Sequence, residues 1–322
     1  MRFGIIGTNF ISDWFAESAL RTSGAELTAV YSRKSDTGRA FAEKHGIPAV
    51  YTSLEEMLGA SDVDAVYVAS PTFLHKEHSI AAIKHGKAVL CEKMIAASLD
   101  EFEEMLDAIT QHGGTLIEAM RPDFDPAFEA LRKSLPRLGK IRRASFEFCQ
   151  YSSRYDAFLA GDVKNAFDPK IKKSALADIG IYPLHVCISL FGEPKSVYSH
   201  SAFLHNGFEG CGTILLGYGE MAATVTYSKV SASVNPSVIE GELGSITVDK
   251  INAPSTITLH LRGKEPEIIP FERRAHNMEY EVERFMAIAE GKEDGTHPLR
   301  LSHSVMKTVD KVYKFSGVTF PE

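Results

Sequence analysis

Short apolar runs alternate with amphipathic stretches through the first 120 residues, and this alternation constrains the fold more than any single motif. Six of the runs read as strands, at residues 2–6, 26–31, 49–51, 65–69, 87–94 and 115–120. Each is followed by a helical pattern, and such alternation requires a parallel sheet with right-handed crossovers. We therefore predict a doubly wound α/β domain of the dinucleotide-binding Rossmann type over residues 1–120.

The pattern changes after residue 120. Helical patterns over residues 126–135, 277–289 and 302–315 accompany short alternating segments, such as 141–151, 213–217, 222–227, 245–248 and 256–261. Gly, Asn and Pro separate these segments, which is typical of antiparallel strands. We predict an α+β domain over residues 121–322 with a large, mainly antiparallel open sheet. The polar segment 152–173 is long for a loop, and loops of that length are usually functional or act as lids.

The first expected strand runs into Gly7-Thr8-Asn9-Phe10-Ile11-Ser12, where the dinucleotide fingerprint G-x-G-x-x-G would place three glycines. Only Gly7 is present. Asn9 tolerates a positive φ, and the small Ser12 allows helix and strand to approach each other. Backbone amides at a helix start can hold a pyrophosphate. We therefore assign Gly7, Thr8, Asn9, Phe10 and Ile11 to cofactor binding; a helix start without a ligand is the alternative.

The second expected strand ends in Tyr31-Ser32-Arg33-Lys34, where NAD-specific sites carry an Asp or Glu for the ribose 2′-hydroxyl. Here Ser32 stands beside Arg33, and Arg39 follows in the next helix. A guanidinium matches a 2′-phosphate with two hydrogen bonds. We therefore assign Ser32, Arg33 and Arg39 to a site that prefers NADP over NAD. The alternative is that these are solvated loop charges.

The fourth expected strand ends at the same edge of the sheet, at Ser70, Pro71 and Thr72, and His75 opens the next helix. We assign these four residues to cofactor binding, with His75 orienting backbone near the cofactor. His75 and His78 can share a helix face, but no third ligand lies nearby in sequence. The sequence therefore predicts no metal site.

The run 87–94 stops abruptly on a carboxylate and an amine, Glu92 and Lys93. In open parallel sheets the ligand lies outside the carboxyl ends of the strands. Both residues are therefore assigned to the cofactor crevice, and Lys93 is the first catalytic candidate. A solvated turn is the alternative reading of this pair.

A second group of candidates lies on a helix expected from about residue 175 to 190. Asp178, Tyr182 and His185 follow one another at i, i+4 and i+7, so they share one face. Pro183 must perturb that helix, because it lacks an N–H and crowds the preceding turn. The spacing alone leaves open whether Tyr182 is a reacting phenol or a core aromatic residue.

Taken together, these motifs resemble the Gfo/Idh/MocA oxidoreductases over essentially the whole chain. Glu92-Lys93-Met94 is similar to the family's E-K-P motif, and Ser70-Pro71-Thr72-Phe73-Leu74-His75 to its T-P-x-x-x-H segment. Asp178-Ile179-Gly180-Ile181-Tyr182 is similar to the D-x-G-x-Y signature of its glucose-fructose oxidoreductase and dihydrodiol dehydrogenase branch. The chain departs from the pattern at Met94, which replaces proline, and at Lys172-Lys173-Ser174, which replaces a glycine-rich run.

The resemblance implies hydride transfer between NAD(P) and a hydroxyl or carbonyl carbon of a sugar, polyol or dihydrodiol. In this reading Tyr182 accepts the proton in oxidation, Lys93 is its electrostatic partner, and Asp178 orients the substrate or the lysine. A free phenol with a pKa of about 10 is a poor base at neutral pH, and a nearby ammonium favours the phenolate. Lys93 as the base is a variant. The alternatives are reduction of an unrelated carbonyl or imine, and a catalytically silent NAD(P)-binding regulator.

The remaining expectations concern partners and location. The formal net charge of -7 comes without charge blocks, which argues against nucleic-acid and anionic membrane partners. The 4 cysteines form no C-x-x-C pair and nothing at the start reads as a signal peptide, so we expect reduced thiols in the cytoplasm. The expected ligand is a small carbohydrate-like molecule. The resemblance implies a homodimer or homotetramer.

Overall fold

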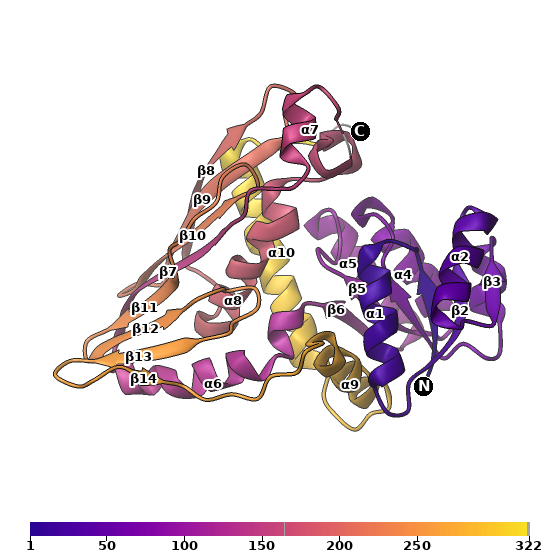
Figure 1. Cartoon of the computed structure of the whole chain (residues 1–322), viewed down its shortest axis with the longest axis horizontal. Coiled ribbons are helices and arrows are strands. Elements are labelled where there is room, and N and C mark those ends of the chain that lie inside the picture. Colours follow the sequence, from indigo (N-terminus) through magenta and orange to yellow (C-terminus); the bar gives the residue numbers. More distant parts are fainter. Residues whose placement is uncertain (164, 321–322) are drawn as a thin grey trace. The chain divides into compact units, whose positions relative to one another are not determined.

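The computed structural model describes residues 1–163 and 165–320. The chain divides into two compact units (Figure 1). The first comprises Met1–Phe124 and Arg274–Arg300, and the second comprises Asp125–Arg273 and Leu301–Glu322.

The first unit contains a sheet of six parallel strands in the order β3-β2-β1-β4-β5-β6. The strands are β1 (Arg2–Ile6), β2 (Glu26–Tyr31), β3 (Ala49–Tyr51), β4 (Ala65–Val68), β5 (Ala88–Glu92) and β6 (Leu116–Ala119). The intervening helices are α1 (Phe10–Arg21), α2 (Ser35–His45), α3 (Leu54–Gly59), α4 (His75–Lys84) and α5 (Leu99–His112). The strand order reverses between β1 and β4, which is where doubly wound sheets bind ligands. The predicted α/β architecture is confirmed.

The core of this unit is aromatic and aliphatic. Phe15 of α1 stacks on Tyr67 of β4 with ring centroids 3.9 Å apart. Helix α9 (Met278–Ala289), far along the chain, returns to this core, where Phe285 lies 5.9 Å from Phe3 of β1 between ring centroids. The compact units therefore differ from the expected ranges 1–120 and 121–322, because the apolar face of α9 is buried in the first unit.

The second unit contains an eight-stranded sheet in the order β14-β13-β12-β11-β7-β10-β9-β8. Among the described strands of this sheet, β7 and β10 alone are paired in parallel, and the other pairs are antiparallel. The strands are β7 (Ile141–Cys149), β8 (Ser196–Phe203), β9 (Glu209–Gly217), β10 (Ala222–Ser228), β11 (Ser237–Gly241), β12 (Gly244–Val248), β13 (Ile257–Leu261) and β14 (Glu267–Ile268). The helices are α6 (Pro126–Ser134), α7 (Tyr155–Leu159), α8 (Ile181–Phe191) and α10 (Thr296–Ser316), whose first residues belong to the first unit. The predicted α+β class is confirmed.

The polar segment 152–173, expected as a long loop, includes short helical elements in its described residues. It contains α7 and two short 3₁₀ turns, η4 (Asn165–Phe167) and η5 (Pro169–Ile171). Phe158 and Phe167 are buried with Phe208, which follows β8, in a small cluster of their own. Aromatic burial therefore holds this segment against the sheet of its unit.

The helix expected over 175–190 is divided. A π-helical turn, η6 (Leu176–Gly180), precedes α8, and Pro183 lies in the first turn of α8. A proline is tolerated in a first turn, because the amide it lacks would have no partner within the helix. The π-helical turn changes the predicted common face: Tyr182 and His185 are buried, whereas Asp178 is half-exposed.

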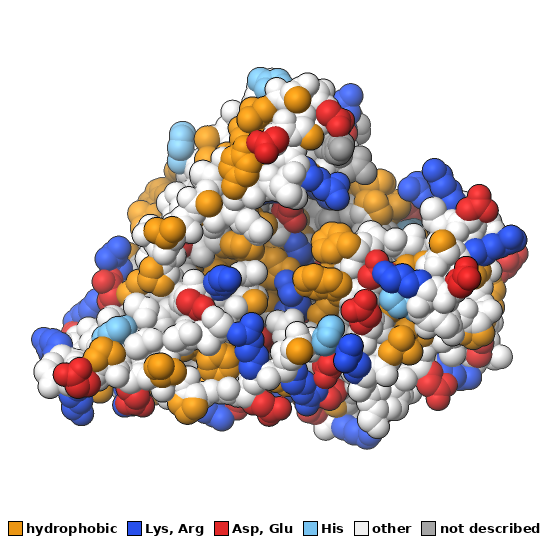
Figure 2. Space-filling view, in the orientation of Figure 1, with side chains coloured by type: hydrophobic (Ala, Val, Ile, Leu, Met, Phe, Trp, Pro, Cys, Tyr) orange, Lys and Arg blue, Asp and Glu red, His pale blue; other side chains and the backbone are white. Residues whose placement is uncertain are grey.

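Acidic and basic side chains are interspersed over the visible face of the molecule (Figure 2). Of the helices in residues 1–163 and 165–320, none has the length and apolarity needed to cross a membrane.

Candidate active site

The turn after β1 is built around Gly7 and Asn9. Gly7 has a φ of 109°, and a Cβ at this position would lie 2.8 Å from the carbonyl oxygen of Ala69. Asn9 does not use the positive φ that the sequence suggested: its φ is -91°, and its side chain caps α1 by accepting hydrogen bonds from Ile11 N at 3.0 Å and Ser12 N at 3.3 Å. The amide of Ile11, which we expected to meet a phosphate, is thus used by the cap. Ser12 is fully buried, as close packing of helix and strand requires.

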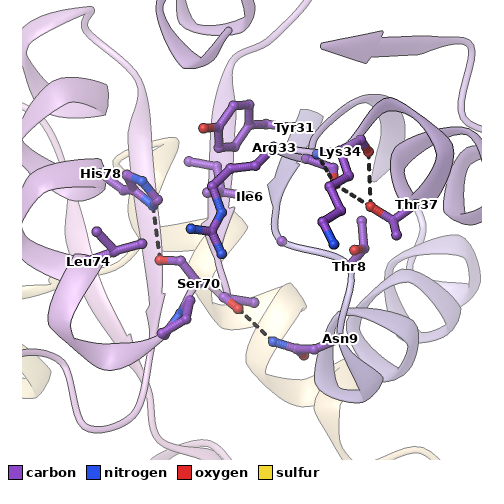
Figure 3. A pocket seen from close by; sticks show the side chains of 14 residues that line it. Ile6, Thr8, Asn9, Tyr31, Arg33, Lys34, Thr37, Ser70, Leu74 and His78 are labelled. Carbon is purple, nitrogen blue, oxygen red and sulfur yellow. Dashed lines mark hydrogen bonds between the residues drawn. The ribbon is translucent and has the colours of Figure 1, made fainter. Parts of the chain in front are cut away.

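The end of β2 presents hydroxyl and cationic groups. Ser32 Oγ lies 2.7 Å from Thr37 Oγ1, and Thr37 Oγ1 also donates to the carbonyl oxygen of Lys34 at 2.9 Å. These bonds shape the loop and fix the start of α2. Arg33 and Lys34 are exposed and extend into the adjoining cavity (Figure 3).

The end of β4 forms the opposite wall of that cavity. His78 Nδ1 lies 3.0 Å from Ser70 Oγ, and the ring of His78 meets that of Tyr31 edge-on at 6.0 Å (Figure 3). Burial, and next the positive charge of Arg33, lower the pKa of His78 to about 4. The ring is therefore neutral at physiological pH.

The cavity between these strand ends has a volume of about 580 Å³. Its lining, all from the first unit, is Ile6, Gly7, Thr8, Asn9, Tyr31, Ser32, Arg33, Lys34, Thr37, Ala69, Ser70, Pro71, Leu74 and His78. None of these described lining residues is Asp or Glu, whereas two are cationic, four carry a hydroxyl group on a short side chain and one is a phenol. This donor set fits an anionic, hydroxylated ligand such as the phosphorylated ribose of a dinucleotide.

Seven of the assigned cofactor residues line this cavity: Gly7, Thr8, Asn9, Ser32, Arg33, Ser70 and Pro71. The other seven lie outside the described lining: Phe10, Ile11, Arg39, Thr72, His75, Glu92 and Lys93. Arg39 is two residues beyond Thr37 on α2, and residues spaced by two point in different directions from a helix. The sequence did not single out Lys34, Thr37, Leu74 or His78 as cofactor residues. Lys34 could have been selected from the sequence, since it is a second cation directly after Arg33.

His75, the first residue of α4, is almost fully buried. Its Nε2 is 2.8 Å from the carbonyl oxygen of Ser70 and its Nδ1 is 2.9 Å from that of Met94. These two acceptors favour a charged ring, but burial outweighs them and lowers the pKa of His75 to about 4. A neutral ring donates to one carbonyl at a time. His75 thus connects the ends of β4 and β5, as a backbone-orienting residue should.

The turn after β5 leaves Lys93 half-buried and Glu92 buried. Glu92 accepts a hydrogen bond of 2.5 Å from Tyr67 OH and one of 3.2 Å from Lys93 N. Burial raises the pKa of Glu92, opposed by Tyr67 and then by Lys93. Glu118 of β6 accepts from Ile95 N at 3.0 Å and so holds the other side of the turn. Glu92 is therefore placed to support this turn.

The second unit contributes Asp178, on η6, and Tyr182, on α8. Asp178 Oδ2 lies 2.6 Å from Nζ of Lys229, which follows β10. The ring of Tyr182 is buried and lies 6.1 Å from that of Phe148 of β7, edge-on. Sequence reasoning missed Lys229, since a lone lysine after a strand carries no signal of its own.

The described residues contain no group of three or more His, Cys, Asp and Glu side chains arranged to hold a metal ion. The site's polar groups are instead hydroxyls, amines and single carboxylates at strand ends.

Two family models match the chain. Residues 1–120 match "Oxidoreductase family, NAD-binding Rossmann fold", and residues 134–247 match "GFO/IDH/MocA C-terminal domain". The chain belongs to the Gfo/Idh/MocA oxidoreductases. The predicted family is thereby confirmed, and with it a nicotinamide-dependent oxidoreductase.

Several known proteins resemble the chain over its full length. The scyllo-inositol 2-dehydrogenase (NADP(+)) IolU of Bacillus subtilis is 41% identical, covering 100% of this chain and 98% of that protein. Trans-1,2-dihydrobenzene-1,2-diol dehydrogenase of Mus musculus is 29% identical with the same coverage. A solved structure of KijD10, a 3-ketoreductase of Actinomadura kijaniata in complex with NADP and TDP-benzene, shares the fold with a TM-score of 0.88, 22% identity and 98% coverage of each chain.

Proposed function

We propose that this Gfo/Idh/MocA protein is an NADP-preferring dehydrogenase that acts on a secondary hydroxyl of a polyol or sugar. The observation that carries the proposal is the cavity at the ends of β1, β2 and β4, whose described lining combines Arg33 and Lys34 with hydroxyl groups and has no carboxylate. The name of the 41% identical relative, an NADP(+)-dependent inositol dehydrogenase, points the same way.

The cofactor preference follows from charge. A 2′-phosphate brought beside a carboxylate would be repelled, whereas Arg33 can offer two parallel N–H donors and Lys34 a mobile ammonium. Both cations are exposed and extend into the cavity, so a phosphate can reach them without displacing packed side chains (Figure 3). We propose that Ser32, Thr37 and Thr8 form hydrogen bonds with hydroxyl groups of the same ligand, next to its 2′-phosphate. Gly7 and Asn9 then keep the turn close to the cofactor phosphates.

The bound cofactor supplies the hydride acceptor, and three residues of the chain act on the substrate. Tyr182 takes the proton of the substrate hydroxyl in oxidation and returns it in reduction. Lys93 stabilises the charge that develops on that oxygen. Asp178 orients the substrate, since its side chain is half-exposed while Oδ2 is held by Lys229. The assignment of Tyr182 and Lys93 to one substrate rests on the family's shared motifs.

A substrate panel with matched cofactors tests the proposal. Reduced nicotinamide is followed by absorbance with inositols, pentoses, hexoses and dihydrodiols, each with NADP and NAD. We expect turnover with a cyclic or open-chain polyol and a higher kcat/KM with NADP. Cofactor binding without turnover on any of these compounds would instead support the catalytically silent regulator.

Substitutions test the residue roles. Lys93→Met and Tyr182→Phe should each lower kcat by about 10²- to 10⁴-fold, the range of a lost general acid or base. Lys87→Met is the matched control, because Lys87 precedes the strand that Lys93 follows and donates to the carbonyl oxygens of Ala60 and Val63. Unchanged turnover in either variant, with the control active, refutes the assignment for that residue.

We further propose a cytoplasmic homodimer or homotetramer. Tyr198 of β8 and Leu215 of β9 are directly paired and exposed on one face of the second sheet, with Phe203 exposed farther along β8. Exposed apolar side chains gathered on a sheet face are typical of a subunit interface. Light scattering coupled to size-exclusion chromatography would measure the mass, and Leu215→Lys should lower it if this face is the interface.

A further inference from the structure

The π-helical turn that carries Asp178 packs against the end of β10. Tyr227 lies near the end of β10 (Ala222–Ser228), and Lys229 is the first residue after it. The ring of Tyr227 lies against Gly180, where a Cβ would come within 2.6 Å of Tyr227 Cγ. Lys229 meets Asp178, two residues before Gly180, at 2.6 Å. The backbone of one strand end thus sets the position of the Asp178 side chain.

Lys229 also holds the segment 152–173. Its Nζ donates to the carbonyl oxygen of Ala166 at 2.8 Å. The same atom lies 4.9 Å from the ring centroid of Phe167 and 5.3 Å from that of Phe208, within the range of cation–π attraction. The side chain is only 5% exposed, so its charge is compensated by these groups and by Asp178.

The backbone of Lys229 is fixed on both sides. Its N–H donates to the carbonyl oxygen of Gly210 at 2.9 Å, and its carbonyl oxygen accepts from Ser152 N at 2.9 Å. A lysine side chain normally has many rotamers, but here the strand end, the aromatic rings and two oxygen atoms leave little freedom. The side chain of Asp178, which is 43% exposed, is thereby held by a rigid, buried cation.

We propose that Lys229 is a positioning residue: it sets the orientation of Asp178 toward the substrate and couples that orientation to the 152–173 segment. The inference rests on the proposed role of Asp178 and adds to it the group that aims the carboxylate. The inference also gives the 152–173 segment a part in substrate selection. The ammonium of Lys229 contacts Ala166, Phe167 and Asp178, so a shift in the position of Ala166 or Phe167 would also shift the carboxylate of Asp178.

Lys229→Met tests the inference. Losing a charge-assisted hydrogen bond should lower kcat by about 10- to 100-fold. The Kd for NADP should stay within about twofold, because the cofactor cavity lies in the other unit. Lys229→Arg keeps the charge and should recover part of kcat. Lys140→Met is the control: Lys140 also pairs with a carboxylate, that of Glu220, but at an exposed position of the same unit. It should keep wild-type kcat.

The double variant Lys229→Met/Asp178→Asn separates the possible failures. If Lys229 acts through Asp178, the double variant should be no slower than Asp178→Asn alone. Wild-type turnover of Asp178→Asn would refute the proposed role of Asp178 itself. An impaired Asp178→Asn beside a fully active Lys229→Met would refute only the positioning role. If Lys229→Met fails to fold, Lys229→Arg and Lys229→Gln replace it, and equal kcat in those two would also refute the inference.

Discussion

The side-chain amide of Asn9 donates a hydrogen bond of 2.7 Å to the carbonyl oxygen of Ala69. The same side chain caps α1, so one residue joins the ends of β1 and β4 and also starts the helix that follows β1. This is the point where the strand order reverses and where the cavity opens.

Replacing Asn9 should therefore affect both stability and cofactor binding. Asn9→Ala removes the cap and the bond to Ala69, and we expect the free energy of unfolding to fall by about 1–3 kcal/mol. NADP affinity should fall with it. Ser98→Ala removes only a cap, that of α5, where Ser98 Oγ accepts from Glu101 N at 3.1 Å. Denaturant titration should show a smaller loss of stability for Ser98→Ala than for Asn9→Ala, and calorimetric titration should show unchanged NADP affinity for Ser98→Ala. Equal effects of the two substitutions would contradict this role for Asn9.

The two basic residues after β2 should control cofactor choice. Arg33→Ala should weaken NADP binding by about 10- to 100-fold, the cost of one or two charged hydrogen bonds, with a smaller loss for Lys34→Ala. NAD binding should change little. Arg39→Ala is the matched control, since Arg39 is a cation on α2 outside the cavity lining. Fluorescence titration with both cofactors gives the ratio, and an equal loss for NAD and NADP in Arg33→Ala would rule out 2′-phosphate recognition by this residue.

Glu281 of α9 is fully buried, and neither carboxyl oxygen has a hydrogen-bond partner among the described residues. Burial, and next the charge of Glu92, raise its pKa well above 4.5. A group whose pKa is raised by folding stabilises the protein fully only below its unfolded pKa, and this stabilisation is lost as the pH rises. The lost stability amounts to about 1.4 kcal/mol per pH unit until the folded pKa is reached.

Glu281→Gln has no proton to lose, so it should unfold at a higher temperature than the wild type at pH 8 and at nearly the same temperature near pH 4.5. Thermal unfolding across this pH range measures the difference. Glu283→Gln, on the same helix, should give no such gain, because Glu283 is exposed and pairs with Arg274 at 2.6 Å. A Glu281→Gln curve parallel to the wild type at every pH would show that Glu281 does not hold its proton on folding.

Gly180 should tolerate no side chain. A Cβ there would lie 2.6 Å from Tyr227 Cγ, so Gly180→Ala must displace either the π-helical turn or the strand. We expect a loss of about 1–3 kcal/mol in the free energy of unfolding and a lower kcat, since Asp178 moves with the turn. Gly59→Ala, at the end of α3 with no atom within 4 Å of the added carbon, should have neither effect. Wild-type kinetics in Gly180→Ala would show that the position of the π-helical turn does not affect kcat.

Local patterns in the sequence were sufficient for most element types and for half of the assigned residues to be found in the lining of the cavity. Alternation of strand and helix predicted the parallel sheet, because a strand-helix-strand unit has essentially one way to pack. Gly7, Ser32, Arg33 and Ser70 were identified because the carboxyl ends of parallel strands meet at one edge, so position along the chain is enough to place them there.

Tertiary structure decided the features that depend on contacts between distant segments. Sequence reasoning selected Arg39 and not Thr37, and only the direction of α2 shows that Thr37 is the one that lines the cavity. Lys229 pairs with Asp178 although the two are 51 residues apart in the sequence. They come together because strand pairing in the second sheet places the end of β10 beside η6. The return of α9 to the first unit is likewise a matter of which core its apolar face fits, and hydrophobic burial has no preference for neighbours in sequence.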